Sequence, residues 1–202
     1  PDLEPRARPQ EPPQSSARRM VFHDDRVAQE YVTRSYLAPE RDSGAQREAA
    51  ALTLLAAVLG DGPTAVLPRD LQFGSQQAVY TTAFYGGTSL DDTTFGLVIV
   101  PSQGVSLQEA EDAMDASVRQ FIQDGVDEDH LARLKMQLRA SQIYARDDAD
   151  AVGNRYGRAL TSGLTVQDVQ EWPEILQSIT GEEIVAAAER VFKVENSVTG
   201  WL

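Results

Sequence analysis

The sequence lacks cysteine and has only two histidines among its 202 residues. The absence of cysteine excludes disulfides, thiolate metal sites and a cysteine nucleophile. No apolar run approaches the ~20 residues that a membrane-spanning helix requires. The chain begins with Pro1 rather than methionine and has no basic-then-apolar export signal. We therefore expect a soluble piece of a longer polypeptide.

Basic residues are also scarce: the chain has 18 of them and 31 acidic residues, which gives a net charge of −13. A field of this sign repels nucleic acid and anionic membranes, so we expect neither as a partner. The hydrophobic fraction of 42% is ordinary for a globular protein.

The order of predicted elements indicates the fold class. Residues 1–18 are rich in proline and predict a linker, and residues 19–202 predict a single domain. Alternating or β-branched segments predict strands at residues 20–22, 27–36, 77–85, 93–100 and 197–202. Capping residues predict helices that begin at Asp42 or Ser43, Ser106, Asp127, Thr165 and Thr180, with a short helical segment at residues 64–73. This order favours an α+β fold, a mainly antiparallel sheet with helices packed on one face.

The polar residues do not assemble into a catalytic or metal site. His23 follows a predicted strand beside two aspartates, and His130 lies in the first turn of a predicted helix, where acidic neighbours complement the helix dipole. The aspartates of residues 147–150 lack the pattern of a calcium loop, and no glycine-rich phosphate loop is present. We therefore predict no catalytic residue, no metal ligand and no cofactor within this chain.

A family resemblance covers about residues 19–202 and is strongest over residues 50–87. A helix ends in Leu59-Gly60-Asp61-Gly62, Leu71-Gln72 follows, and Ala78-Val79-Tyr80 leads into a strand. In order and spacing these motifs resemble the insulinase or pitrilysin family of zinc peptidases (inverzincins). That family includes the mitochondrial processing peptidase and the core subunits of respiratory complex III.

The resemblance implies the zinc-free, C-terminal type of domain. The family's zinc motif, His-x-x-Glu-His, needs two histidines four residues apart, and this sequence has no such pair. The implied partner is a similarly folded zinc-bearing domain, in the same chain or in another chain. In active members the zinc-free half holds the substrate peptide with a tyrosine and an arginine. The tyrosine position falls on Tyr80, the arginine position falls on Gln72, and Arg69 is the nearest basic substitute.

Two functions follow from the resemblance. The first is an accessory domain that completes the peptide-binding chamber of a zinc metallopeptidase, and the second is a scaffolding domain with no role in proteolysis. Gln72 favours the second, because a neutral amide lacks the charged fork of arginine. An autonomous enzyme is a third, weaker reading. We expect a bacterial protein of the periplasm or cytoplasm, and an upstream zinc motif would favour the peptidase.

Overall fold

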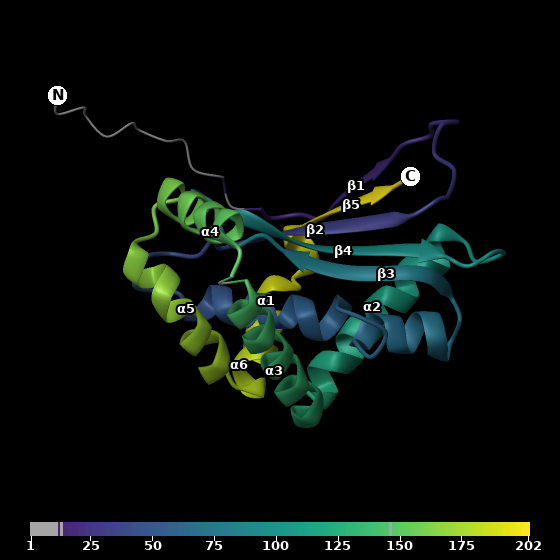
Figure 1. The fold of residues 1–202 in the computed structure, drawn as a ribbon. Coiled ribbons are helices and arrows are strands. Elements are labelled where there is room, and N and C mark those ends of the chain that lie inside the picture. Colours follow the sequence, from purple (N-terminus) through teal and green to yellow (C-terminus); the bar gives the residue numbers. More distant parts are fainter. Residues whose placement is uncertain (1–11, 13, 146) are drawn as a thin grey trace.

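A five-stranded sheet lies against a layer of helices in the computed structural model, which describes residue 12, residues 14–145 and residues 147–202 (Figure 1). The spatial order of the strands is β1-β5-β2-β4-β3. Their bounds are β1 (Arg18–Val21), β2 (Val32–Ala38), β3 (Ala78–Tyr85), β4 (Thr93–Pro101) and β5 (Ser197–Trp201). Among the described strands, β1 and β5 alone pair in parallel, and the other neighbours are antiparallel. The predicted α+β fold with a mainly antiparallel sheet is confirmed.

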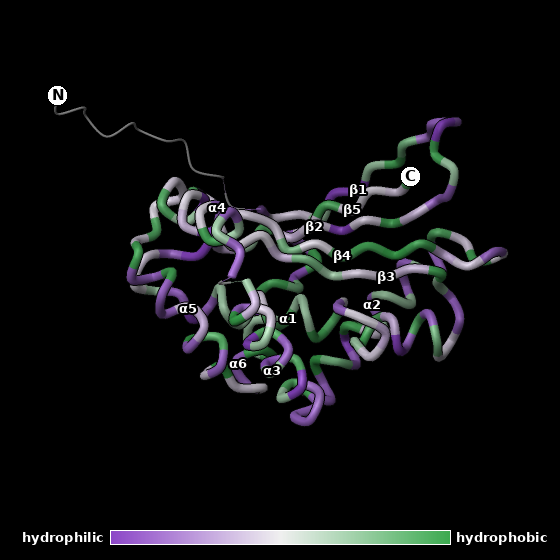
Figure 2. The backbone as a smooth tube through the Cα atoms, viewed as in Figure 1, coloured by the Kyte–Doolittle hydropathy of each residue, from purple (hydrophilic) through white to green (hydrophobic). Residues whose placement is uncertain are grey.

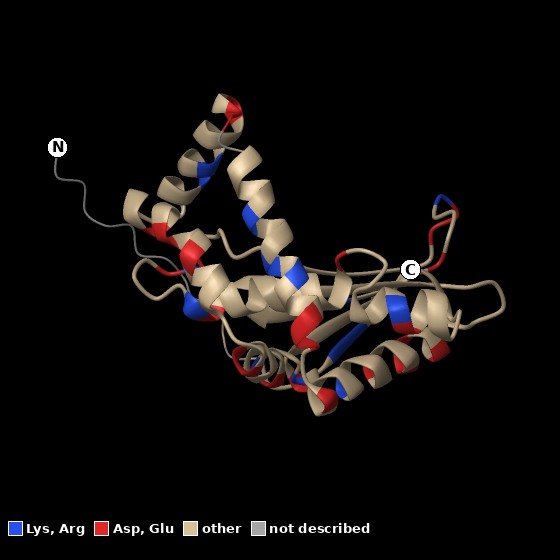
Figure 3. Cartoon of the chain, turned by 60° about the horizontal axis from the view of Figure 1, so that its bottom comes forward, with Lys and Arg blue, Asp and Glu red and all other residues tan. Residues whose placement is uncertain are grey.

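The helical layer follows the chain order. It consists of α1 (Arg47–Gly60), the π-helix η1 (Pro68–Gly74), α2 (Leu107–Asp124), α3 (Glu128–Tyr144), α4 (Ala149–Thr161), α5 (Val166–Ser178), α6 (Gly181–Val191) and the 3-10 turn η2 (Val194–Asn196). Acidic and basic positions are scattered along these helices (Figure 3). Within the described part of the chain, none of the helices has the length and apolar character needed to cross a membrane.

The core fills the space between the sheet and α1. Phe95, Leu97 and Ile99 alternate along β4 and are fully buried on the side that faces the helices. Leu52 and Leu59 of α1 belong to the same buried cluster. Figure 2 shows hydrophobic residues running along β4 and within α1. Burial of these side chains contributes about 1.5–3 kcal/mol each.

A buried carboxylate fastens the sheet to α2. Glu111 accepts hydrogen bonds from Arg19 Nη2 at 2.6 Å and from Trp201 Nε1 at 2.7 Å, and it also pairs with Arg34. Arg34 is 2% exposed and completes its charge balance with Asp115. These partners lie on β1, β2 and β5, so α2 holds three strands through one cluster.

The predicted helix starts are confirmed at four sites. Ser106, Thr165 and Thr180 each form a capping box with the acidic residue three positions later. The side chain of Asp127 accepts a hydrogen bond from the backbone of His130 at the start of α3. Strands β3, β4 and β5 also match their predicted segments within one residue at each end.

Two predicted boundaries are wrong. Residues 27–31 are not a strand, because the Asp24 carboxylate accepts the backbone N–H of Arg26 at 2.9 Å and bends the chain before β2. Helix α1 begins at Arg47 rather than after Asp42 or Ser43, and its N-cap Gln46 makes no capping bond. Helix α4 was not predicted. Most of the proposed linker, residues 1–11 and 13, lies outside the described residues.

Candidate functional site

One face of the sheet is left uncovered by the helical layer and lacks charge over the four strands β2 to β5. Since successive side chains of a strand alternate between faces, the residues next to the buried positions point away from the helices. We call those of β2 to β5 the open face: Thr33, Ser35, Leu37, Tyr80, Thr82, Phe84, Thr94, Gly96, Val98, Val100, Val198 and Gly200. Not one of these twelve residues is charged, whereas charged residues form 24% of the chain. On the neighbouring β1, Arg18 lies beside Val198 and brings a charge to the margin of this face.

The open face ends at an unpaired strand edge. Among the described strands, β3 has β4 as its sole neighbour, so alternate N–H and C=O groups of β3 face outward. Val79, Tyr80 and Phe84 of this strand are exposed apolar side chains. An irregularity between Ala78 and Tyr80 shifts the register at the start of the strand. An apolar edge of this kind is suited to the addition of an extended chain.

Tyr80 lies on the open face, as expected for a residue that meets a ligand. Its side chain is 52% exposed. The next residue, Thr81, is buried on the helical side opposite Ile99, which fixes Tyr80 on the other side of the strand. Its role as a substrate-binding residue stays a prediction.

Gln72 lies on the opposite side of β3 from Tyr80. Its Nε2 donates a hydrogen bond of 2.7 Å to Thr81 Oγ1, which links η1 to β3 below the sheet. The amide is therefore engaged within the domain. The structure does not bring Gln72 and Tyr80 onto one face.

Arg69 points to a third location. It forms an ion pair with Asp70, Nε to Oδ1 at 2.8 Å, and lines a hollow of about 230 Å³ with His130 and Asp127. Its side chain is 57% exposed. Arg69 therefore does not replace the missing arginine beside Tyr80 in this arrangement.

His130 lines the same hollow and is 6% exposed. Within the described residues its Nε2 has no hydrogen-bond partner. Burial lowers the pKa of His130, and the charge of Arg133 adds to this effect. Among the residues that the structure describes, no group of three or more histidine and carboxylate side chains is arranged to hold a metal ion.

A polar cluster that sequence analysis missed surrounds Asp168. Beyond its capping role, the carboxylate accepts hydrogen bonds from Ser43 Oγ at 2.7 Å, from Gly44 N at 3.0 Å and from Gln46 Nε2 at 3.1 Å. Hydrogen bonds from Thr165, and then from Ser43 and Gly44, lower the pKa of the Asp168 carboxyl well below its usual range, although burial opposes them. These contacts join segments that are far apart in the chain, so no local sequence motif predicts them. They also explain the late start of α1.

A family profile described as the peptidase M16 inactive domain matches residues 1–138. No curated protein gives a significant match. A protease from Helicobacter pylori has a TM-score of 0.89 and 20% identity over 100% of this chain and 47% of its own. This chain thus spans about half the length of that protein.

Two further structures have the same fold. The inactive peptidase domain of a zinc protease from Bordetella parapertussis has a TM-score of 0.76 and 16% identity, covering 87% of this chain and 92% of its own. The first half of the periplasmic protease PqqL from Escherichia coli has a TM-score of 0.80 and 15% identity over 98% of this chain and 44% of its own. The resemblance to the insulinase family is confirmed, and this chain belongs to the peptidase M16 inactive-domain family.

Proposed function

We propose that this chain is the zinc-free half of a two-part zinc peptidase and closes the peptide chamber over a zinc-bearing half. The observation that carries the proposal is the uncharged open face, bordered by the free edge of β3 and by the exposed Tyr80. An extended peptide added to this edge gains main-chain hydrogen bonds, and the Tyr80 hydroxyl can orient it.

Several similar structures support the two-part arrangement. This chain covers 47% of the Helicobacter protease and 44% of the half of PqqL that was solved, so each holds a second portion of similar size. The implied zinc belongs to that second portion, because the described residues of this chain offer no ligand set. All of these relatives are bacterial, which supports a bacterial origin, with the periplasm or the cytoplasm as the compartment.

Reconstitution with the zinc-bearing half tests this proposal. The chain alone should hold no stoichiometric zinc by mass spectrometry and should not cleave a fluorogenic peptide. Addition of the zinc-bearing half should produce chelator-sensitive turnover well above that of either part. Chelator-sensitive cleavage by this chain alone would contradict the proposal.

A scaffolding role is the second candidate, and Gln72 is the observation that favours it. The residue at the arginine position is neutral, and its amide is already bonded to Thr81. A scaffolding domain should bind the zinc-bearing half as tightly as an accessory domain would, but it should leave the peptide turnover of that half unchanged. The same reconstitution therefore separates the two functions.

A further inference from the structure

A pocket of about 490 Å³ lies at the other end of β3 from Tyr80. It is enclosed by the segment after β2, the β3–β4 connection and the helices α3, α4 and α5. A neighbouring hollow of about 410 Å³ shares Arg41, Thr88, Arg158 and Trp172 with it. This volume is within the range of sites that bind small molecules.

The lining of the pocket has the opposite charge to the rest of the chain. Arg41, Arg155 and Arg158 line it, and no described aspartate or glutamate does so. The chain as a whole carries a net charge of −13. The three cations favour an anionic ligand at this pocket. Because the net negative charge of the chain repels anions at long range, the attraction must come from direct contacts with these arginines.

Arg41 is a buried cation that forms no ion pair with any described residue, although the charge of Asp168 stabilises it. It is 8% exposed, and it donates from Nε to Gln46 Oε1 and from Nη2 to the Asp168 carbonyl oxygen, both at 2.6 Å. Its Nη1 has no hydrogen-bond partner among the described residues, and burial lowers the pKa of Arg41 to about 10. Because the Asp168 carboxylate already accepts several other hydrogen bonds, it does not pair directly with this guanidinium. A bound oxyanion would offset the cost of burying this charge.

Arg155 and Arg158 supply two more cations from α4. They are three positions apart and so share one side of the helix. Both are exposed, and within the described part of the chain neither forms an ion pair. Asn154 adds an amide beside them. Guanidinium groups of this kind bind carboxylates and phosphates through paired hydrogen bonds.

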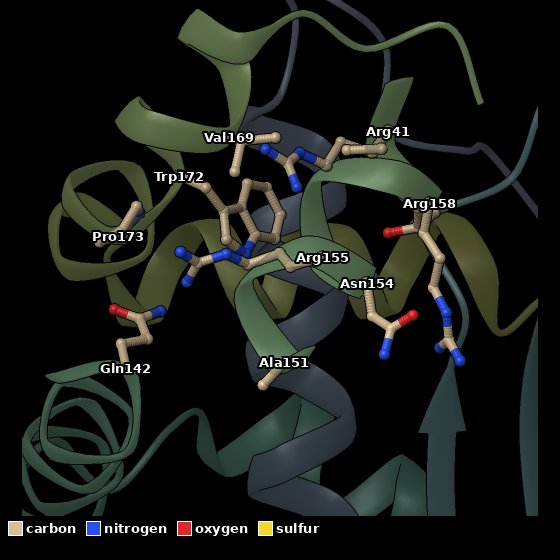
Figure 4. A pocket seen from close by; sticks show the side chains of 11 residues that line it. Arg41, Gln142, Ala151, Asn154, Arg155, Arg158, Val169, Trp172 and Pro173 are labelled. Atoms are coloured by element: carbon tan, nitrogen blue, oxygen red, sulfur yellow. The ribbon is translucent and has the colours of Figure 1, made fainter. Parts of the chain in front are cut away.

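Trp172 gives the pocket an apolar wall. The guanidinium carbon of Arg41 lies 3.9 Å from the centre of its ring, which fixes both groups. Figure 4 shows the Arg41 guanidinium beside the indole of Trp172. Val169 and Pro173 of α5 extend this surface. A ligand that fits must join an anionic group to a compact apolar body.

We propose that this pocket binds a small oxyanion, a phosphate monoester or a carboxylate, attached to an apolar or aromatic group. The oxyanion lies at the free Nη1 of Arg41, and the apolar group packs against Trp172. The exposed side chains of Arg155 and Arg158, whose guanidinium groups point in different directions in Figure 4, turn toward the oxyanion when it binds. The proposal does not depend on the peptidase role, because the pocket lies apart from the open face.

Three probes distinguish the source of the oxyanion. Phenyl phosphate, phenylacetate and inorganic phosphate are titrated into the intact chain at constant ionic strength by calorimetry. The two tryptophan indole N–H signals are followed in parallel by NMR and assigned with Trp172→Phe. We expect either phenyl phosphate or phenylacetate to bind saturably. Binding should shift the indole N–H signal of Trp172 and leave that of Trp201 unchanged. Inorganic phosphate should bind about tenfold more weakly or worse, because it leaves the apolar wall uncovered.

Exposed arginines provide variants that should keep the fold. Arg155→Gln combined with Arg158→Gln should weaken binding by about tenfold or more, since each removes a charge-assisted hydrogen bond. Arg119→Gln on α2 removes the same charge elsewhere and should change affinity less than about twofold. Absence of binding by all three probes at millimolar concentration would overturn the proposal. An equal loss in the Arg119→Gln variant would also overturn it, because the attraction would then be non-specific.

Discussion

Gly60, the last residue of α1, packs directly against the backbone of Ala83 in β3. A Cβ atom at position 60 would lie 2.1 Å from Ala83 N and 2.9 Å from Ala83 Cα. The glycine of the Leu59-Gly60-Asp61-Gly62 motif therefore allows close approach of a helix to the edge strand. Its φ is not positive, unlike that of Gly62 at +82°.

We expect Gly60→Ala to destabilise the protein by about 1–3 kcal/mol, since overpacking against a backbone outweighs the better helix propensity of alanine. Urea unfolding followed by circular dichroism measures the change. Gly153 of α4 is the matched control, because a Cβ there meets no atom within 4 Å. Gly153→Ala should be neutral or stabilising by up to about 1 kcal/mol.

Glu111→Gln should be more damaging. It leaves Arg34 buried with only Asp115 as a charged partner. Loss of one member of a buried ion cluster costs about 3–5 kcal/mol, and denaturant unfolding should show it as a lower midpoint. Glu48→Gln removes an exposed pair with Arg190 and should cost less than about 1 kcal/mol. A similar loss of unfolding free energy in both variants would mean that burial does not strengthen the Glu111 ion cluster.

His130 should make stability fall in mild acid. Its folded-state pKa is lowered by burial and by Arg133, although Asp127 opposes this effect. The unfolded chain therefore takes up a proton near pH 6.5 while folded His130 stays neutral, so stability is full above that pH and declines below it.

Unfolding midpoints at pH 7.5 and pH 5 measure this dependence. The lowered carboxyl pKa of Asp168 acts only at lower pH, so it does not contribute in this window. His130→Gln should flatten the dependence, and His23→Gln at an exposed position should not. A pH dependence unchanged by His130→Gln would contradict the assignment.

Tyr80→Phe tests the proposed peptide contact. Removal of one hydroxyl hydrogen bond should reduce kcat/KM of the reconstituted peptidase by about fivefold, equivalent to about 1 kcal/mol. The fold should be unaffected, because the side chain is exposed. Tyr144→Phe, at a tyrosine 76% exposed on α3, is the control and should leave turnover unchanged.

Elements with local signals were predictable from the sequence. The capping boxes of Ser106, Thr165 and Thr180 depend on residues three positions apart, and all three form. The β-branched and apolar residues of segment 93–100 likewise predicted the strand β4. The order of these elements was sufficient for the fold class.

Long-range contacts explain what the sequence did not predict. The start of α1 depends on Asp168, which lies on α5. The turn before β2 is the exception, because its contacts are local: the Asp24 carboxylate accepts the Arg26 N–H and the Asp24 carbonyl oxygen accepts the Val27 N–H. The sequence assigned Tyr80 to a strand. It did not show that Gln72 lies on the opposite side of that strand, which follows from the hydrogen bond between Gln72 and Thr81. The pocket around Arg41 and Trp172 combines separate segments and has no sequence motif.

The anchoring of β1 and β5 on Glu111 has a dynamic consequence. Arg19 and Trp201 reach the same carboxylate, and the strands that carry them run parallel to each other. When that carboxylate shifts, both strands lose their tether at the same moment. Their amide protons should therefore exchange with solvent in step, as one opening unit at the far side of the sheet from β3.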